Sequence, residues 1–191
     1  MRKYRKKGNC FVDCGASFGY FSALAGAIVD PEGSDISFEP GPQNQSLLLL
    51  NLIANGTLTG EVHQVALSDN VGIYGDGGTG ANGAISPFDG DPNHLGTYDL
   101  VRSTTLDNVI GSRDFDMMKC DVEGAEGRVF RGGEQTLKRC IPVLVFEFSP
   151  PSLAVTSGMS GEELLQFLGA LNYSFDIVDR PYRNAPSQRG G

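Results

Sequence analysis

Short apolar runs typical of buried strands alternate along this chain with longer runs of helical spacing, and this alternation constrains the fold more than any other feature. The strand-like runs cover residues 10–13, 36–39, 62–67, 116–121, 143–148 and 175–178. The helix-like runs cover residues 18–29, 43–55, 106–112, 125–131 and 161–171. Alternating strands and helices imply a mostly parallel sheet with helices on both faces and right-handed connections. We therefore predict a protein of the α/β class.

The length and composition indicate one globular domain. The chain has 191 residues, of which 40% are hydrophobic and 20% charged, and this is enough for one packed core. We assign residues 10–181 to this domain, residues 1–9 to a basic leader and residues 182–191 to a frayed polar tail. Residues 70–98 form a Gly-rich insert, which is either a hairpin or lid over a site or a mobile loop without function.

The charge and the lack of long apolar runs exclude several classes of protein. A formal net charge of −8 argues against a general nucleic-acid binder. No run approaches the roughly 18 apolar residues of a membrane span, and no signal-peptide core follows the basic leader. We therefore expect a cytoplasmic protein. Cys10, Cys14, Cys120 and Cys140 lack C-x-x-C spacing, so we expect reduced buried thiols and no metal site.

The stretch FVDCGASFGYFS places two glycines where the first strand turns into the first helix. Gly15 and Gly19 fit a sharp turn with positive φ, or a ligand that approaches the backbone closely. Ligands of open α/β sheets bind at the carboxyl ends of the strands, so this loop is the expected floor of a nucleotide-like site. Ser17 stands where a dinucleotide fingerprint has glycine, and Asp13 would repel a diphosphate. Both residues favour a cationic or zwitterionic ligand such as S-adenosylmethionine.

Two further marks point to an adenosine-containing ligand. Glu39 ends the second strand roughly twenty residues after Gly19, where an acidic residue accepts hydrogen bonds from both ribose hydroxyls. The alternative is a carboxylate that caps the following helix. Ser68 and Asp69 follow the third strand and are candidates to accept a hydrogen bond from the adenine amino group. A local side-chain turn is the alternative for these two residues.

The stretch MMKCDVEGAEGRVFRGG gathers charged side chains around the end of the fourth strand. Lys119, Asp121 and Glu123 alternate, so they share one face if the strand stays extended. Glu126 follows them, and Glu147 ends the next strand toward the same crevice. We expect these groups, with Asp121 or Glu123 as the base, to deprotonate a hydroxyl nucleophile. The alternatives are a Lys–Asp ion pair that fixes the turn, and a carboxylate metal site that includes Glu147.

These stretches together resemble the FkbM-type S-adenosylmethionine-dependent methyltransferases. The matching pieces run in the family's order over most of residues 10–150, and they are FVDCGASFGYFS, ISFEPGPQN, VALSDNVG, TTLDNVI, MMKCDVEGAEGRVFRGG and VLVFEFSP. The resemblance implies a Rossmann-like class I methyltransferase fold, methyl transfer to oxygen, and S-adenosylmethionine as the cofactor. Nine residues precede the first strand and no seventh antiparallel strand is evident, so we expect a version of this fold truncated at both ends.

The resemblance also implies roles for individual residues. Those expected to bind the cofactor are Asp13, Gly15, Ala16 and Gly19 at the methionine part, Glu39 at the ribose, and Ser68 and Asp69 near the adenine. We expect a small molecule or glycan with a free hydroxyl as the acceptor, and His94 in the insert is a weaker candidate base. The alternatives are a non-catalytic domain that binds the cofactor and an NAD-dependent oxidoreductase, which the missing middle glycine disfavours.

Overall fold

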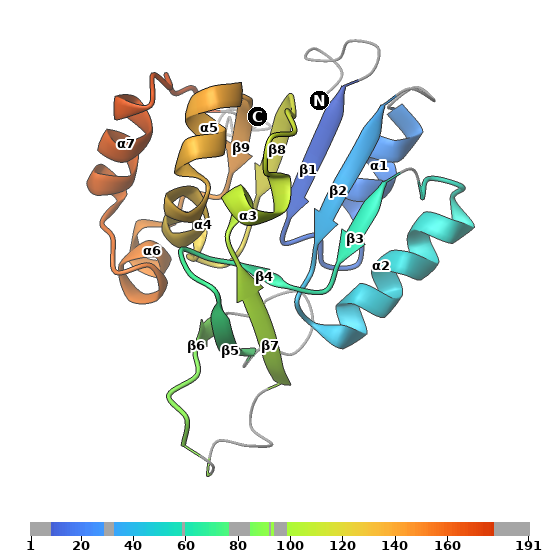
Figure 1. Cartoon of the computed structure of the whole chain (residues 1–191), viewed down its shortest axis with the longest axis horizontal. Coiled ribbons are helices and arrows are strands. Elements are labelled where there is room, and N and C mark those ends of the chain that lie inside the picture. The colour runs from blue at the N-terminus through green and yellow to red at the C-terminus, as the bar shows by residue number, and fades with distance from the viewer. Residues whose placement is uncertain are drawn as a thin grey trace, which may run out of the picture.

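The centre of the molecule is a five-stranded parallel sheet (Figure 1), seen in a computed structural model that describes residues 9–28, 33–58, 60–76, 85–91, 93 and 99–177. The strand order is β3-β2-β1-β8-β9. These strands are β1 (Cys10–Cys14), β2 (Ser34–Phe38), β3 (Glu61–His63), β8 (Met117–Cys120) and β9 (Val143–Phe146). The direction of strand addition reverses between β1 and β8. In sheets of this kind, ligands bind at such a reversal, beyond the carboxyl ends of the strands.

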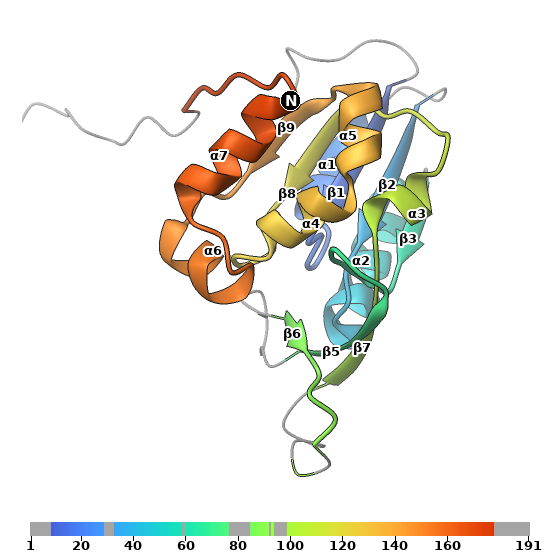
Figure 2. The same cartoon turned by 60° about the vertical axis from the view of Figure 1, so that its left-hand side comes forward.

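Helices cover both faces of the parallel sheet, as the alternation in the sequence predicts. Figure 2 shows two of them, α1 (Tyr20–Ile28) and α2 (Pro42–Ala54), behind the strands. The helices at the other face are α3 (Leu106–Ile110), α4 (Glu126–Gly132) and α5 (Glu134–Cys140). Two further helices, α6 (Pro150–Thr156) and α7 (Gly161–Ala170), follow β9 and share the hydrophobic core of α4 and α5.

The strands are apolar because both faces of the sheet are buried. Val12 of β1 is paired with Met118 of β8, and both side chains are fully buried. Phe130 of α4 packs edge to face on Phe146 of β9, with 5.4 Å between the ring centroids. Asp13 breaks the apolar pattern of β1 and is nevertheless fully buried. A buried carboxylate is costly without partners, so its surroundings need a separate account.

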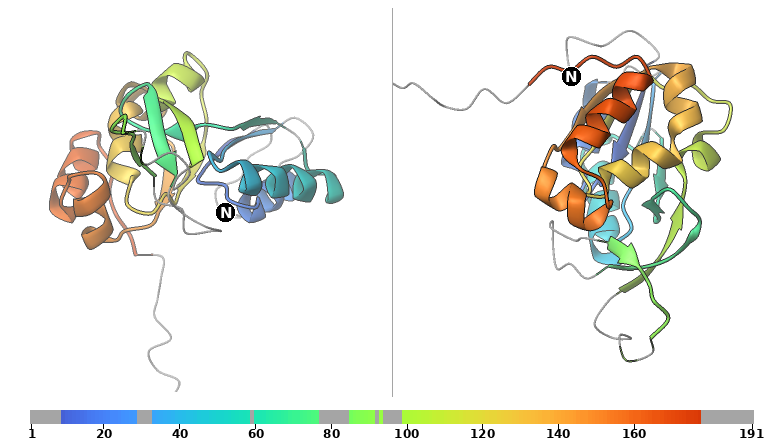
Figure 3. Two further views of the ribbon diagram at one scale, coloured as in Figure 1. Left: turned by 90° about the horizontal axis from the view of Figure 1, so that it is seen from below. Right: turned by 90° about the vertical axis from the view of Figure 1, so that its left-hand side faces the viewer.

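A second sheet of four strands lies beyond the carboxyl ends of the parallel strands (Figures 1 and 3). Its order is β4-β7-β5-β6, with β4 (Ala66–Leu67), β5 (Gly72–Asp76), β6 (Ile85–Pro87) and β7 (Asp99–Thr104). β5 runs antiparallel to both β6 and β7. The described part of the insert therefore forms a hairpin, whereas residues 77–84, 92 and 94–98, with the candidate base His94, lie outside the described residues.

Two of the predicted elements were wrong. Residues 62–67 form two strands, because β3 pairs with β2 whereas β4 pairs with β7 of the second sheet. The helix predicted over residues 125–131 does end at this point, since α4 stops at Gly132 with Gly133 as its C-cap residue. The helix α5 that follows was not predicted, and the Asp107 carboxylate accepts hydrogen bonds from the backbone N–H groups of residues 135 and 136 at its start. The strand predicted over residues 175–178 is not formed at residues 175–177. Outside the described residues lie residue 178, the tail of residues 182–191 and leader residues 1–8.

Two further elements were missed. α6 follows Ser149 with Pro150 at its first position, which is a common helix start. β7 lies within a stretch that carries no strong alternation of polar and apolar residues. In the described ranges, no helix combines the length and the apolar character that a bilayer span requires.

Candidate functional site

A cavity opens at the carboxyl ends of β1 and β2, between the parallel sheet and the second sheet. Its walls come from the loop after β1, the end of β2, strands β4 to β6 and the turn after β8. The lining residues are Cys14, Gly15, Ser17, Phe38, Glu39, Pro40, Asn44, Val65, Ala66, Leu67, Asp76, Ile85, Asp121, Val122 and Glu123. Gly15, Glu39, Asp121 and Glu123 are therefore brought together, as the sequence predicts for a site at this edge of the sheet.

The two glycines of the loop after β1 are required by close packing and by positive φ. Gly15 has φ +74°, and a Cβ atom there would lie 2.0 Å from the backbone oxygen of Asp121. Gly19 has φ +88°, and a Cβ atom there would lie 2.5 Å from a methyl carbon of Leu48. The glycines thus let the loop touch the turn after β8 on one side and α2 on the other.

Four backbone N–H groups of this loop, those of residues 15, 16, 17 and 19, already have acceptors within the chain. Gly15 and Ala16 both donate to the carbonyl oxygen of Phe38, at 3.1 and 2.9 Å. Ser17 donates to Oε2 of Glu39 at 2.8 Å, and Gly19 donates to the carbonyl oxygen of Ala16 at 2.8 Å. A diphosphate needs such N–H groups as donors. Because four of these groups are occupied, the loop offers few donors to a diphosphate, which adds to the argument from the missing middle glycine.

Glu39 is held rigidly at the end of β2. Its side chain is 6% exposed, and its carboxylate accepts hydrogen bonds from the backbone N–H groups of Ser17 and Gly41 and, at 3.4 Å, from the Asn44 amide. Burial raises the pKa of Glu39 above its ordinary value, although these hydrogen bonds oppose the shift. Gly41 is the N-cap residue of α2. The carboxylate thus holds the N-cap residue of α2 and also lines the cavity, and its contact with a ribose stays a prediction.

Asp13 and Lys119 form a buried ion pair behind the cavity. The Lys119 ammonium lies 3.4 Å from Oδ1 of Asp13 and 3.6 Å from Oδ2 of Asp121, and it donates to the carbonyl oxygen of Gly15 at 2.5 Å. The second oxygen of Asp13 accepts a hydrogen bond from Ser22 at 2.7 Å. The alternative of a Lys–Asp pair that fixes the turn therefore describes Lys119 well.

The pKa shifts of this pair follow from burial and mutual attraction. Burial raises the pKa of Asp13, and Lys119 and Ser22 counteract only part of that shift. Burial by itself would lower the pKa of Lys119, but the carboxylates of Asp13 and Asp121 outweigh it and the net shift is upward. Lys119 thus remains a cation that a neighbouring proton acceptor does not easily deprotonate.

The turn after β8 presents two carboxylates to the cavity. The strand ends at Cys120, and Glu123 and Gly124 both have positive φ, +54° and +93°. The expectation that residues 119, 121 and 123 share one extended face was therefore wrong. The Asp121 side chain is 45% exposed. Partial burial raises the pKa of Glu123, and the carboxylates of Glu147 and Asp121 raise it further.

Glu126 stabilises this turn by a hydrogen bond to its backbone. The sequence pattern does not distinguish this role from those of the neighbouring acidic residues. Its side chain is 1% exposed, and Oε1 accepts a hydrogen bond from the backbone N–H of Val122 at 3.0 Å. Burial raises its pKa, although hydrogen bonds from the backbone N–H groups of Val122, Gly124 and Glu126 itself oppose the shift. The Glu126 carboxylate thus accepts a backbone hydrogen bond at a turn where no neighbouring strand supplies an acceptor.

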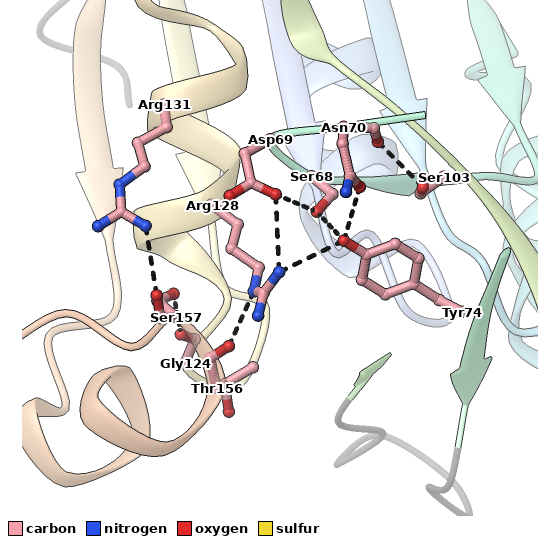
Figure 4. A network of polar contacts seen from close by, with 10 residues as sticks. All are labelled: Ser68, Asp69, Asn70, Tyr74, Ser103, Gly124, Arg128, Arg131, Thr156 and Ser157. Atoms are coloured by element: carbon pink, nitrogen blue, oxygen red, sulfur yellow. Dashed lines mark hydrogen bonds and ion pairs between the residues drawn. The ribbon is translucent and has the colours of Figure 1, made fainter. Parts of the chain in front are cut away.

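Ser68 and Asp69 lie in a polar network outside the residues that line the cavity (Figure 4). Ser68 Oγ is 2.6 Å from the hydroxyl of Tyr74, and Asp69 lies 3.6 Å from the guanidinium of Arg128. Arg128 also donates to the carbonyl oxygen of Thr156, the last residue of α6, at 2.8 Å. This network ties the second sheet to α4 and α6, and an adenine contact of Ser68 or Asp69 stays a prediction.

The other expected residues lie close behind the cavity wall. Asp13, Ala16, Gly19 and Lys119 are not among the lining residues, and Ala16 packs on Leu48 and Leu52 of α2. Within the part of the chain that the structure describes, no group of three or more His, Cys, Asp or Glu side chains is arranged to hold a metal ion. The alternative metal site of Asp121, Glu123 and Glu147 therefore lacks geometric support.

Removal of the Lys119 charge should destabilise the fold because Asp13 would stay buried without a counter-ion. We expect Lys119→Met to lower the free energy of unfolding by about 3–5 kcal/mol. Asp13→Asn combined with Lys119→Met removes both charges and should recover most of that loss. Urea unfolding of the two variants and of the wild type measures this. A loss below about 1 kcal/mol in Lys119→Met would contradict the pair's structural role.

Glu126 should make the stability depend on pH in a definite direction. Its folded pKa is raised above the ordinary value of 4.5, so the folded chain binds the proton more tightly than the unfolded chain, and stability falls as the pH rises from about 4.5. Glu126→Gln has no such proton. We expect its free energy of unfolding, relative to the wild type, to increase from about pH 4 to pH 7. Urea unfolding at several pH values tests this, and a constant or decreasing difference would contradict it.

Comparisons with known proteins agree with this geometry. The family model described as the methyltransferase FkbM domain matches residues 13–175. A precorrin-6y C5,15-methyltransferase from Geobacter metallireducens superposes with a TM-score of 0.53 at 13% identity, over 91% of this chain and 68% of that chain. An S-adenosylmethionine-dependent O-methyltransferase from Thermotoga maritima superposes with a TM-score of 0.52 at 14% identity, over 95% of this chain and 52% of that chain.

These matches differ in what they establish. At such identities the two solved structures show the fold, which is the Rossmann-like class I methyltransferase fold. This chain spans about half the length of the Thermotoga protein. No curated protein matches the chain at significant sequence similarity. The family model covers the loop after β1, the end of β2 and the turn after β8, and the chain therefore belongs to the FkbM methyltransferase domain family.

Proposed function

We propose that this chain is an S-adenosylmethionine-dependent methyltransferase that methylates a hydroxyl group of a small molecule or glycan. The observation that carries the proposal is the position of Glu39, a buried carboxylate on the wall of the same cavity as Gly15 and Asp121. A carboxylate at the end of the second strand suits the two hydroxyls of a ribose. Its Oε1 and Oε2 are oriented by backbone donors, so little reorganisation is needed on binding.

The charge of the cavity supports a cationic cofactor over a dinucleotide. Glu39, Asp76, Asp121 and Glu123 contribute carboxylates, and no Lys or Arg is found among the described lining residues. These carboxylates attract the ammonium and sulfonium groups of S-adenosylmethionine and repel a diphosphate. The backbone N–H groups of residues 15, 16 and 17 are occupied by Phe38 and Glu39, which further disfavours the alternative of an NAD-dependent oxidoreductase.

The residues of the turn after β8 are placed to assist the transfer. When bound, S-adenosylmethionine supplies an electrophilic methyl group on a sulfonium. Asp121, half-exposed at the cavity wall and 3.6 Å from Lys119, is the candidate to accept the proton of the acceptor hydroxyl. Glu123, whose pKa is raised by burial and by neighbouring carboxylates, is the second candidate. Lys119 orients Asp121 and the Gly15 carbonyl, so we now assign it to positioning rather than proton transfer.

The four cysteines bear on the location of the protein. Cys10, Cys14, Cys120 and Cys140 are free thiols, and unpaired thiols are typical of a reducing compartment. We therefore place the protein in the cytoplasm as part of the same proposal.

The cofactor is tested most simply by binding. We expect S-adenosylhomocysteine to bind the chain in calorimetric titration, and NAD not to bind. Glu39→Gln retains one oxygen but loses the charge, so it should weaken the binding about 10- to 100-fold. Glu134→Gln, an exposed carboxylate of α5, is the matched control and should bind as the wild type. Unchanged affinity in Glu39→Gln would count against the ribose assignment.

The proton acceptor is tested by kinetics with a panel of hydroxyl acceptors. Asp121→Asn should lower kcat about 100-fold or more, whereas the dissociation constant of S-adenosylhomocysteine should change much less. An unchanged kcat would remove Asp121 from the chemistry. Binding of the cofactor without turnover on any acceptor would instead favour the alternative of a non-catalytic cofactor-binding domain.

A further inference from the structure

The helix α2 carries large apolar side chains on its outer side as well as on its inner side. Leu48 and Leu52 are fully buried and pack against the loop after β1. Leu47, Leu50 and Ile53 are 49%, 62% and 63% exposed. In Figure 1, α2 lies at the right-hand edge of the molecule, and none of the described elements lies beyond it on that side. Apolar residues all round are typical of a helix that is covered on both sides.

The exposed residues of α2 form one continuous face, which is centred on Leu50. An α-helix turns by about 100° per residue, so Leu47 and Ile53 lie about 60° to either side of Leu50. Ser46 and Ala54 lie about 40° to either side of it, and all five residues are exposed. We call these five residues the α2 face. Its small residues, four positions before and four after the centre, leave room for a second helix to approach closely.

The α2 face lacks the charges that a solvent-exposed helix normally carries. Neither α2 nor its neighbour α1 contains Asp, Glu, Lys or Arg, although 20% of the residues of the whole chain are charged. These helices therefore supply no charge to attract a nucleic acid, an anionic lipid surface or a charged peptide. An exposed apolar patch is instead typical of an interface.

Charge complementarity favours a second copy of this chain as the partner. Two copies, each with a formal net charge of −8, repel one another, and the repulsion is weakest where the facing surfaces carry no charge. The polar residues that border the α2 face are the exposed amides Gln43, Asn51 and Asn55. An amide both donates and accepts hydrogen bonds, so these residues can pair with the same residues of a second copy. A two-fold interface requires a surface that is complementary to itself in this way.

We propose that the α2 face joins two copies of this chain into a two-fold symmetric dimer in which the two α2 helices run antiparallel. A two-fold axis at Leu50 places this side chain against its own counterpart. Leu47 then faces Ile53 of the partner subunit, because the two positions are equally distant from Leu50. Ser46 faces Ala54 of the partner subunit for the same reason.

The dimer is independent of the proposed function and goes beyond it. None of the five residues of the α2 face is among the residues that line the cavity. Dimer formation therefore does not require either cavity to close, and a change at Leu50 should leave the binding of S-adenosylhomocysteine unchanged. Failure of the dimer and failure of the cofactor assignment are thus separate outcomes.

Sedimentation of the whole chain tests the interface. We expect the wild type to sediment as a dimer and Leu50→Glu to weaken the dimer about 100-fold or more, because two carboxylates would face each other on the axis. Leu50 is exposed in the single chain, so Leu50→Glu should fold, which circular dichroism checks. Val155→Glu is the matched control: Val155 belongs to α6 and is 87% exposed, and this variant should stay dimeric.

A mixture of two charged variants tests the position of the axis. Leu50→Glu and Leu50→Lys should each be monomeric at concentrations at which the wild type is dimeric. Their equimolar mixture should form a one-to-one dimer, because opposite charges then meet on the axis. Two monomeric variants that do not associate when mixed would overturn the pairing of Leu50 with itself.

Two further results would overturn the dimer. A wild-type chain that stays monomeric would do so, and if this monomer sedimented with vesicles of neutral phosphatidylcholine, the α2 face would be assigned to a lipid surface. A dimer that Leu50→Glu leaves intact would place the interface elsewhere on the chain. The titration with S-adenosylhomocysteine tests the proposed function separately from all of these results.

Discussion

The buried pair of Asp13 and Lys119 is the interaction on which the candidate site depends. Asp13 belongs to β1 and Lys119 to β8, the two strands between which the order of the sheet reverses. The Lys119 ammonium reaches the carbonyl oxygen of Gly15 and the carboxylate of Asp121 as well as Asp13. One cation thereby connects the strand, the glycine turn and the acidic turn. Two ions in a sheet interior are expensive, so the pair is better explained by this organising role than by stability.

The same arrangement explains why the cavity is acidic. The positive charge of Lys119 lies behind the wall, whereas Glu39, Asp121 and Glu123 lie on it. Each carboxylate is oriented differently: Glu39 by backbone donors, Asp121 by Lys119, and Glu123 by a left-handed turn that Glu126 supports. Preorganised groups of this kind cost little to align when a ligand binds. The second sheet completes the cavity with Asp76 and Ile85.

Much of the fold was predictable because it follows from local patterns. Short stretches with characteristic spacing predict the parallel sheet, the glycine turn after β1 and the position of Glu39. The pairings that build the site are not local: Lys119 and Gly15 are 104 positions apart, and Ser17 and Glu39 are 22 apart. The positive φ of Glu123 and Ser17 was not predictable either, since neither Glu nor Ser is typical of that backbone conformation. Residues 62–67 divide between two sheets because β3 pairs with β2 and β4 pairs with β7. Their own sequence does not show which strands they pair with.

The most direct test of this account is a crystal structure of the chain with S-adenosylhomocysteine bound. We expect the ribose hydroxyls within hydrogen-bond distance of the Glu39 carboxylate and the amino-acid part beside the loop of residues 15–17. The Lys119 contacts to Asp13 and Gly15 should be retained. A ligand bound elsewhere on the molecule, or a loop that must break its contact with Lys119 to admit the ligand, would contradict it.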